Sequence, residues 1–327
     1  MKLFAYSLRE YDELGFLEDC AKERGFEFGW TSDYPTLDNV GLCKGYDCLS
    51  IITNPMTPRL LDAYHAQGIK SIATRSIGFE HIDVEHARSL GMRVAHAAYP
   101  PEGVANYAIM LMMMAMRKVK LIERAQAYQE FGLKGKIGKD ISSATVGVIG
   151  TGKIGATVVR HLSGFGCKIL ACDPYEKDEV RKCATYVSLD ELLTSSDVIT
   201  LHAPGSAENH HMIDANAISR MKRGVVIVNA ARGSLIDTDA LVSGLESGQV
   251  GAAALDTIEN EAGLYYLDRS RDILPNRDRA VLDALPNCIV LPHMAFYTAT
   301  DVRHMVESNV DALMAFDRGE DSALEVK

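Results

Sequence analysis

The chain has 327 residues, which favours two domains, and its 47% hydrophobic and 24% charged residues are those of an ordinary globular protein. The formal net charge is −10, and an acidic surface repels phosphate backbones and anionic lipids, so neither nucleic acid nor a membrane is expected as a partner. The same charge means that a small anionic substrate needs a local cationic site.

Cysteine spacing and the N-terminus bear on the compartment. Seven cysteines follow no repeated close spacing, which argues against a disulfide framework and a zinc site; metal binding at Cys43 and Cys48 is the less favoured interpretation, and no metal is expected. Residues 1–6 form a short apolar run that is typical of a strand rather than a signal peptide. The longest apolar stretch, 107–116, is about half the length that spans a bilayer. These features together predict a cytoplasmic protein.

The first hundred residues alternate short apolar runs with amphipathic segments. This rhythm indicates βαβ units and a mostly parallel sheet covered on both faces. Strands are expected at 2–7, 46–53, 69–75 and 93–97, and helices near 10–24, 57–67 and 83–90. A long helix from Glu102 to about Val119 follows, apolar on nearly every side, which predicts burial within its domain or against a second subunit.

A second series of strands begins after this helix. Six strands with intervening helices make a complete doubly wound sheet, and they are expected at 144–149, 168–173, 197–203, 225–230, 251–256 and 288–291. One more helical segment after 298 is too short to stand alone and is expected to return to the first domain. The predicted fold is therefore α/β with two doubly wound Rossmann-like domains. The first is discontinuous and flavodoxin-like, with parts at 1–100 and 298–327, and the second, 101–297, is inserted in it.

A glycine-rich turn follows the first strand of the second series. Gly150, Gly152 and Gly155 form a G-x-G-x-x-G pattern, in which they allow a tight turn, a close approach to a pyrophosphate and close helix packing. The next strand ends in Asp173, 23 residues beyond Gly150, where a carboxylate binds the adenine ribose hydroxyls and repels a 2′-phosphate. The pattern predicts NAD(H) rather than NADP(H), although Asp173 could instead serve as a cap at the strand end.

Three further segments, which contain Arg232, Glu261 and His293, follow the ends of later strands. They lie at the sheet edge where doubly wound folds bind ligands. Reduction of a 2-keto acid requires a cation for the carboxylate, which suits Arg232, and a proton donor near neutral pH, which suits His293. Glu261 could hold that imidazole in one tautomer and keep it protonated. Taken singly, these residues could also be a surface ion-pair partner, a strand-end cap and a solvated loop acid.

The chain resembles the D-isomer-specific 2-hydroxyacid dehydrogenases over nearly its whole length. Residues 75–83, 98–101 and 292–298 are similar to the branch that contains D-lactate and D-2-hydroxyisocaproate dehydrogenases. The resemblance implies that Arg232, Glu261 and His293 are catalytic and that hydride passes from NAD(H) to C2 on the face that gives the D product. A homodimer through the NAD-binding domain is also expected, since the long helix is apolar on nearly every side. The substrate-binding residues that the resemblance implies are Ile77, Gly78, Tyr99, Arg232 and Phe296.

The resemblance also implies a set of cofactor contacts. Beyond the three glycines, these are Lys153, Ile154, Asp173, Ala203, Pro204, Asn209, Ala230, Ala231, Arg232 and Asp256. One departure from the pattern is Asn106, which stands where many members have an acid early in the long helix.

The size of the substrate is left open by the sequence. Pyruvate, giving D-lactate, is favoured, but the aromatic residues near His293 could equally form a pocket for 2-ketoisocaproate, phenylpyruvate or indolepyruvate, because a methylene-sized difference changes selectivity by only about 1–3 kcal/mol. An alternative of another class is an NADH-sensing, corepressor-like binding protein, which the branch-specific motifs disfavour. Formate or phosphoglycerate dehydrogenase activity fits the 295–298 segment less well.

Overall fold

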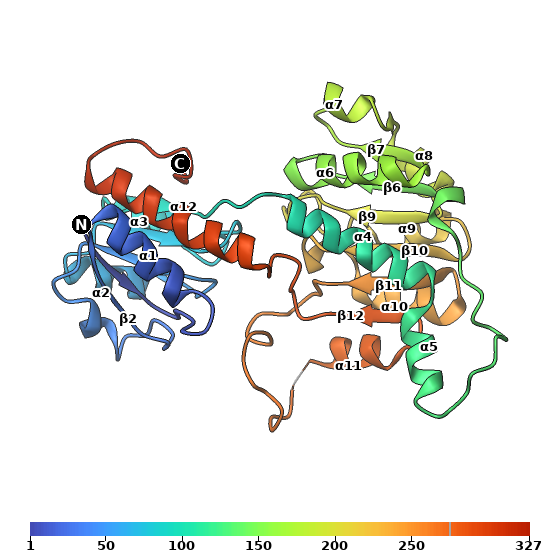
Figure 1. Cartoon of the computed structure of the whole chain (residues 1–327), viewed down its shortest axis with the longest axis horizontal. Helices are drawn as coiled ribbons and strands as arrows, with labels where there is room; N and C mark the ends of the chain where they lie inside the picture. The colour runs from blue at the N-terminus through green and yellow to red at the C-terminus, as the bar shows by residue number, and fades with distance from the viewer. Residues whose placement is uncertain (275) are drawn as a thin grey trace. The chain divides into compact units, whose positions relative to one another are not determined.

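The computed structural model describes residues 1–274 and 276–327. The chain divides into two compact units, of which the first combines Met1–Pro100 with Tyr297–Lys327 and the second is Pro101–Phe296 (Figure 1). The first unit is therefore discontinuous in sequence, as predicted. Tyr297 belongs to the first unit, whereas the second domain predicted from the sequence, 101–297, included it.

The first unit is built on a five-stranded parallel sheet. Its strand order, β2-β1-β3-β4-β5, is the flavodoxin-like order 2-1-3-4-5. The central strands are buried on both faces, which explains why they appear in the sequence as continuous apolar runs. The strands are β1 Lys2–Ala5, β2 Glu27–Trp30, β3 Cys48–Ile51, β4 Ser71–Thr74 and β5 Arg93–Ala95.

The C-terminal helix completes the core of the first unit. Val306, Val310 and Leu313 on α12 are buried in the same cluster as Leu3 and Ala5 of β1. The helix packs against α1 and β4, so the last part of the chain belongs to the sheet that begins it. The helices of this unit are α1 Leu14–Arg24, η1 Val40–Cys43, α2 Pro58–Ala66, α3 Val84–Ser89 and α12 Ala299–Asp317.

The second unit is built on a seven-stranded parallel sheet. Read from β8, its order is β8-β7-β6-β9-β10-β11-β12, which is the 3-2-1-4-5-6 arrangement of dinucleotide-binding sheets with one further strand. Six of the strands were expected, and the seventh, β8, has only two residues. The strands are β6 Thr145–Ile149, β7 Lys168–Cys172, β8 Thr185–Tyr186, β9 Val198–Leu201, β10 Val225–Asn229, β11 Val250–Leu255 and β12 Cys288–Val290.

Helices cover both faces of this sheet. They are α4 Glu102–Met116, α5 Val119–Gln126, η2 Ile141–Ser143, α6 Lys153–Leu162, η3 Ser163–Phe165, α7 Asp178–Arg181, α8 Leu189–Ser195, α9 Ala215–Arg220, η4 Gly233–Leu235, α10 Thr238–Ser247 and α11 Arg277–Ala284. Among the described residues, none of the helices is both long enough and apolar enough to cross a bilayer.

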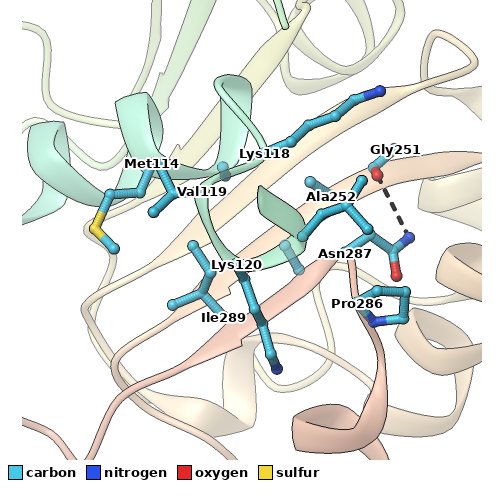
Figure 2. Close-up of a pocket in the computed structure, with 12 residues that line it drawn as sticks. Met114, Lys118, Val119, Lys120, Gly251, Ala252, Pro286, Asn287 and Ile289 are labelled. Carbon is cyan, nitrogen blue, oxygen red and sulfur yellow. Dashed lines mark hydrogen bonds between the residues drawn. The ribbon is translucent and has the colours of Figure 1, made fainter. Parts of the chain in front are cut away.

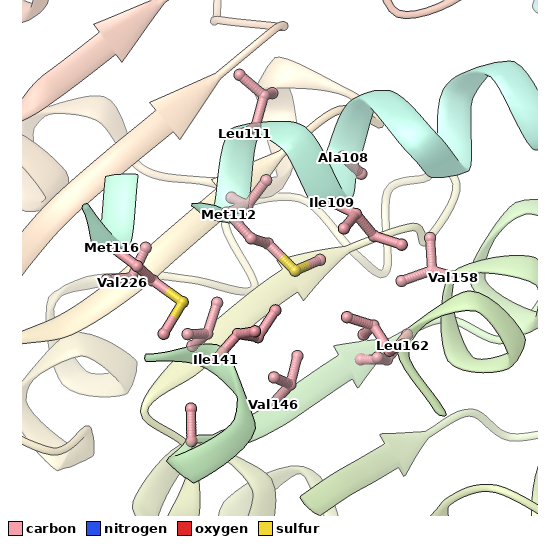
Figure 3. Packing of buried hydrophobic residues seen from close by; sticks show 14 of the residues in the cluster. Ala108, Ile109, Leu111, Met112, Met116, Ile141, Val146, Val158, Leu162 and Val226 are labelled. Carbon is pink, nitrogen blue, oxygen red and sulfur yellow. The ribbon is translucent and has the colours of Figure 1, made fainter. Parts of the chain in front are cut away.

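The long apolar helix α4 lies on the sheet beside α6. Figure 3 shows Ile109 and Met112 packed with Val158 and Leu162 of α6 in the main cluster of this unit. The prediction that α4 is buried is confirmed for this face, whereas Met110 and Met113 on the other side remain more than a third exposed.

Candidate active site

The glycine-rich turn joins β6 to α6. Gly150 has φ of +88°, in the region that favours glycine, and a Cβ there would lie 2.7 Å from the backbone N of Ala203. A Cβ at Gly155 would lie only 1.9 Å from the carbonyl oxygen of Gly150. The two glycines therefore let the turn and the first turn of α6 come together.

The middle glycine of the motif, Gly152, differs from the other two. A Cβ at Gly152 would meet nothing within 4 Å, and Gly152 is the N-cap of α6 without a side-chain cap. Open space in front of uncapped helical N–H groups is what a pyrophosphate requires, because the helix N-terminus favours negative charge. The turn therefore fits a dinucleotide. The predicted contacts Lys153 and Ile154 lie in the first turn of α6.

Asp173 follows β7 and lies against the glycine-rich turn. One carboxylate oxygen accepts the backbone N–H of Thr151 at 2.6 Å, and the other accepts that of Tyr175 at 2.8 Å. These bonds fix the orientation of the carboxylate while each oxygen keeps a second lone pair. An acid is thereby held beside the turn, where a ribose would lie.

A histidine that the sequence did not single out lies behind the turn. His202 follows β9, and its Nε2 is 2.9 Å from Oγ1 of Thr200. Its Nδ1 is buried and has no hydrogen-bond partner among the described residues. Burial lowers the pKa of His202 to about 4, so the ring is neutral at neutral pH.

Glycines also bring the Arg232 turn against two neighbouring loops. A Cβ at Gly233 would lie 2.1 Å from the backbone carbonyl of Ile258, and one at Gly205 would lie 3.0 Å from Cγ of Arg232. The loop after β9, which carries the predicted cofactor contacts Ala203, Pro204 and Asn209, therefore approaches the predicted carboxylate clamp. The acidic loop after β11 approaches it from the other side.

Two hydrogen bonds of the Asn229 side chain hold the backbone that follows β10. Its side-chain oxygen accepts the N–H of Ala231 at 3.0 Å, and its side-chain nitrogen donates to the carbonyl of Arg232 at 2.8 Å. Asn229 is fully buried. It fixes the path of the 230–232 backbone, where Ala230, Ala231 and Arg232 were predicted to contact the cofactor, and its position at a strand end was the only signal in the sequence.

The central pair of the site consists of His293 and Glu261. Nδ1 of His293 lies 2.6 Å from Oε1 of Glu261, and Oε2 of the same carboxylate accepts the N–H of Ile258 at 3.1 Å. A carboxylate that accepts from Nδ1 fixes the tautomer and leaves Nε2 as the nitrogen that can face a substrate. Both side chains are partly exposed, at 31% and 22%, so the pair is accessible.

Asp256 holds the loop that carries His293. Its two carboxylate oxygens accept the N–H groups of Met294 and Ala295 at 2.8 and 2.9 Å, and its carbonyl accepts that of His293 at 2.9 Å. Burial raises the pKa of Asp256, and the two N–H bonds oppose that effect. Asp256 is 0% exposed, and the cofactor contact predicted for it stays a prediction.

An aromatic pair borders His293. The hydroxyl of Tyr266 donates to the carbonyl of His293 at 2.7 Å, and the Tyr266 ring meets that of Phe296 edge-on at 6.1 Å. Tyr266 and His293 both have φ in the left-handed region, at 68° and 55°. Non-glycine residues in this region cost about 1–3 kcal/mol and gather at functional sites.

Three predicted substrate residues, Ile77, Gly78 and Tyr99, belong to the first unit. The turn at Ile77 and Gly78 is shaped by Ser76, whose hydroxyl donates to the carbonyl of Gly78 at 2.7 Å. Within residues 1–274 and 276–327, no protein group accepts from the N–H of Ile77 or Gly78. The binding of the substrate carboxylate by these two N–H groups stays a prediction.

Two cavities are lined by other residues than the three candidate catalytic ones. One, of about 140 Å³, lies beside β11 and β12 under α5, where Met114, Val119, Ala252 and Ile289 make it apolar (Figure 2). The other lies in the first unit and is bordered by the carboxylates of Glu10, Asp12, Glu18 and Asp19, which would repel a keto acid. Neither contains Arg232, Glu261 or His293.

The fold and the site define a dinucleotide-dependent dehydrogenase. The family profile described as D-isomer specific 2-hydroxyacid dehydrogenase, NAD binding domain, matches residues 109–295. The chain belongs to this family, and it is an NAD-dependent oxidoreductase.

Similar proteins cover most or all of the chain. A D-specific alpha-keto acid dehydrogenase of Enterococcus faecalis is 42% identical over 88% of each chain. An aromatic 2-oxoacid reductase of Clostridium sporogenes is 38% identical over 97% of this chain and 96% of its own. The crystal structure of a D-lactate dehydrogenase from Treponema pallidum matches with a TM-score of 0.92 and 34% identity over 100% of both chains.

Proposed function

We propose that the protein reduces a 2-keto acid to the D-2-hydroxy acid with NADH, and that His293, Glu261 and Arg232 carry out the catalysis. NADH supplies the hydride. The observation that carries the proposal is the 2.6 Å contact between Nδ1 of His293 and Glu261, beside the Arg232 turn. It leaves Nε2 of His293 to donate a proton to the carbonyl oxygen. The guanidinium of Arg232 offers paired donors to the substrate carboxylate.

His293→Ala tests the proton donor. We expect the turnover number to fall by about 10²–10⁴-fold while NADH binding is unchanged, because general acid catalysis contributes on this scale. Steady-state kinetics with a 2-keto acid and fluorescence titration with NADH separate the two effects. A variant that reduces the acid at the wild-type rate would show that another group supplies the proton.

The preferred substrate is pyruvate in this proposal, giving D-lactate. The Tyr266 and Phe296 rings, 6.1 Å apart, narrow the space beside His293, which suits a small acid. The same rings offer an apolar wall, and a relative 38% identical to the chain is an aromatic 2-oxoacid reductase, so a bulky acid is the second candidate. NADH consumption with pyruvate, 2-ketoisocaproate, phenylpyruvate and indolepyruvate decides between them by the ratio of kcat/KM. NADH binding without consumption of any of the four would contradict the proposed substrates.

We also propose that two copies of the chain associate through the second unit. Large apolar side chains are exposed along the segment that follows α5, where Tyr128 and Leu133 are each 88% exposed, Ile137 is 84% exposed and Phe131 is 74% exposed. An apolar surface of this kind is typical of a subunit interface. Phe131→Glu together with Leu133→Glu should convert a dimer to a monomer in light scattering, and an unchanged mass would contradict the proposal.

We infer a cytoplasmic location from the thiols. All seven cysteines are free, which suits a reducing compartment.

A further inference from the structure

A cluster of two histidines and a carboxylate lies outside the residues assigned to catalysis. His210 and His211 are in the loop between β9 and α9, and Glu259 is in the loop after β11. One ligand atom from each of these residues lies within 4.8 Å of the other two. Nε2 of His211 is 2.7 Å from Oε1 of Glu259, and the two imidazole rings stack with centroids 3.9 Å apart. Nothing in the activity of a 2-keto acid reductase requires this grouping.

The carboxylate of the cluster is held in place from behind. Oε2 of Glu259 accepts from the hydroxyl of Thr238 at 2.7 Å and from its backbone N–H at 3.2 Å. Oε1 is thereby directed toward the histidines. Outer hydrogen bonds of this kind orient a ligating side chain and are a regular feature of metal sites.

The backbone presents both histidines on one side. His211 has φ of 53°, and its N–H donates to the carbonyl of Ser234 at 2.8 Å. This left-handed residue turns the chain so that consecutive side chains stack instead of pointing apart, as the small ring separation shows. A non-glycine residue in this conformation is costly and is kept where surrounding contacts impose it.

We propose that His210, His211 and Glu259 bind a divalent transition-metal ion such as Zn²⁺. Two imidazoles and one carboxylate are a ligand set of zinc, with Zn–N of about 2.0–2.1 Å and Zn–O of about 2.0–2.2 Å, and water completes the coordination. The exposed ring of His210 moves inward, and the ion takes the place of the proton that His211 and Glu259 share. Nearby Asp214 and Asp237 add to the negative potential that attracts a cation.

The ion would link two loops that carry candidate catalytic and cofactor residues, beside the turn that carries Arg232. His211 is two residues beyond Asn209, Glu259 is two residues before Glu261, and Ser234 follows the Arg232 turn. A bound ion would link the loop after β9 to the loop after β11 and raise the unfolding temperature of the protein. The proposal does not depend on which keto acid the protein reduces.

The test is a titration of the untagged, full-length protein with Zn²⁺ and with Co²⁺ at pH 7.5. We expect one ion per chain with micromolar affinity by calorimetry, and a cobalt spectrum that contains no thiolate charge-transfer band. His210→Ala and Glu259→Gln should each weaken binding at least tenfold. His65→Ala, which removes an exposed histidine from α2, is the matched control and should bind as the wild type does.

Cys183→Ser addresses a competing ligand, because Cys183 is an exposed thiol. Zinc binding that survives this substitution and is lost in His210→Ala supports the site. Binding that is lost in Cys183→Ser and kept in His210→Ala overturns it, and so does the absence of any binding tighter than millimolar. His210 is exposed, so its alanine variant should fold, and its unfolding temperature without metal should match that of the wild type.

Discussion

Substitutions at two glycines of the glycine-rich turn, Gly152 and Gly155, test cofactor binding and folding separately. An alanine at 155 would place its methyl carbon 1.9 Å from the carbonyl oxygen of Gly150, so α6 must move away from the turn by more than 1 Å. Overpacking of this kind costs about 1–3 kcal/mol. In a domain of this size it should lower the unfolding temperature by roughly 2–12 °C, since each kcal/mol shifts it by about 2–4 °C.

An alanine at 152 should behave differently. Its methyl carbon meets nothing within 4 Å, and φ of −58° lies outside the left-handed region, so the unfolding temperature should stay within about 2 °C of the wild type. The methyl group would stand in the open space where we place the pyrophosphate. We expect the dissociation constant of NADH to rise at least about tenfold, which corresponds to about 1.4 kcal/mol.

The assay is thermal unfolding of both variants without cofactor, followed by fluorescence titration with NADH. A Gly152→Ala variant that binds NADH as tightly as the wild type would refute the assignment of that space to the pyrophosphate. A Gly155→Ala variant that unfolds at the wild-type temperature would show that the turn and α6 are not held as close as the structure has them.

Three more predictions follow from the same site. Arg232→Ala should raise KM for the keto acid and lower kcat/KM by about 10²-fold or more, because the paired donors to the carboxylate are lost; an unchanged KM would remove its role as carboxylate clamp. Asp173→Ala should lower the preference for NADH over NADPH, measured as the ratio of the two kcat/KM values, and a constant ratio would contradict the proposed ribose contact. Burial lowers the pKa of His202 to about 4, against about 6.5 when unfolded, so the unfolded chain binds more protons between these values and stability falls as pH falls through this window. The contribution is about 2 kcal/mol between pH 7 and pH 5, and urea unfolding of His202→Gln should show a correspondingly weaker pH dependence than the wild type.

The strands that the sequence predicted are those buried on both faces. β6, β7 and β10 appear as continuous apolar runs, and a continuous apolar run indicates a strand that is buried on both faces of its sheet. The two missed strands lie at sheet edges. β2 contains a glycine and is nowhere fully buried, and β8 has two residues, so neither produces an apolar run. The other two edge strands, β5 and β12, are mostly buried and were predicted, so burial rather than position in the sheet decides which strands an apolar run reveals.

Some residues of the candidate site could be predicted from the sequence, and others could not. His293, Glu261 and Arg232 could be named from the sequence because their chemistry follows from their position after strand ends. The supporting bonds of Asp256, Asn229 and Tyr266 could not, since each joins a side chain to backbone whose path only the fold determines. The pairing of His211 with Glu259 spans 48 residues, and no sequence spacing indicates it.

The discontinuity of the first unit has a consequence for biosynthesis. A ribosome releases Met1–Pro100 long before α12, whose Val306, Val310 and Leu313 cover the sheet, has been made. The inserted unit is contiguous and can fold as soon as it emerges. The unit whose synthesis begins first is therefore the last to complete its fold. Until the last thirty or so residues arrive, the nascent N-terminal sheet exposes an apolar face that chaperones would have to shield.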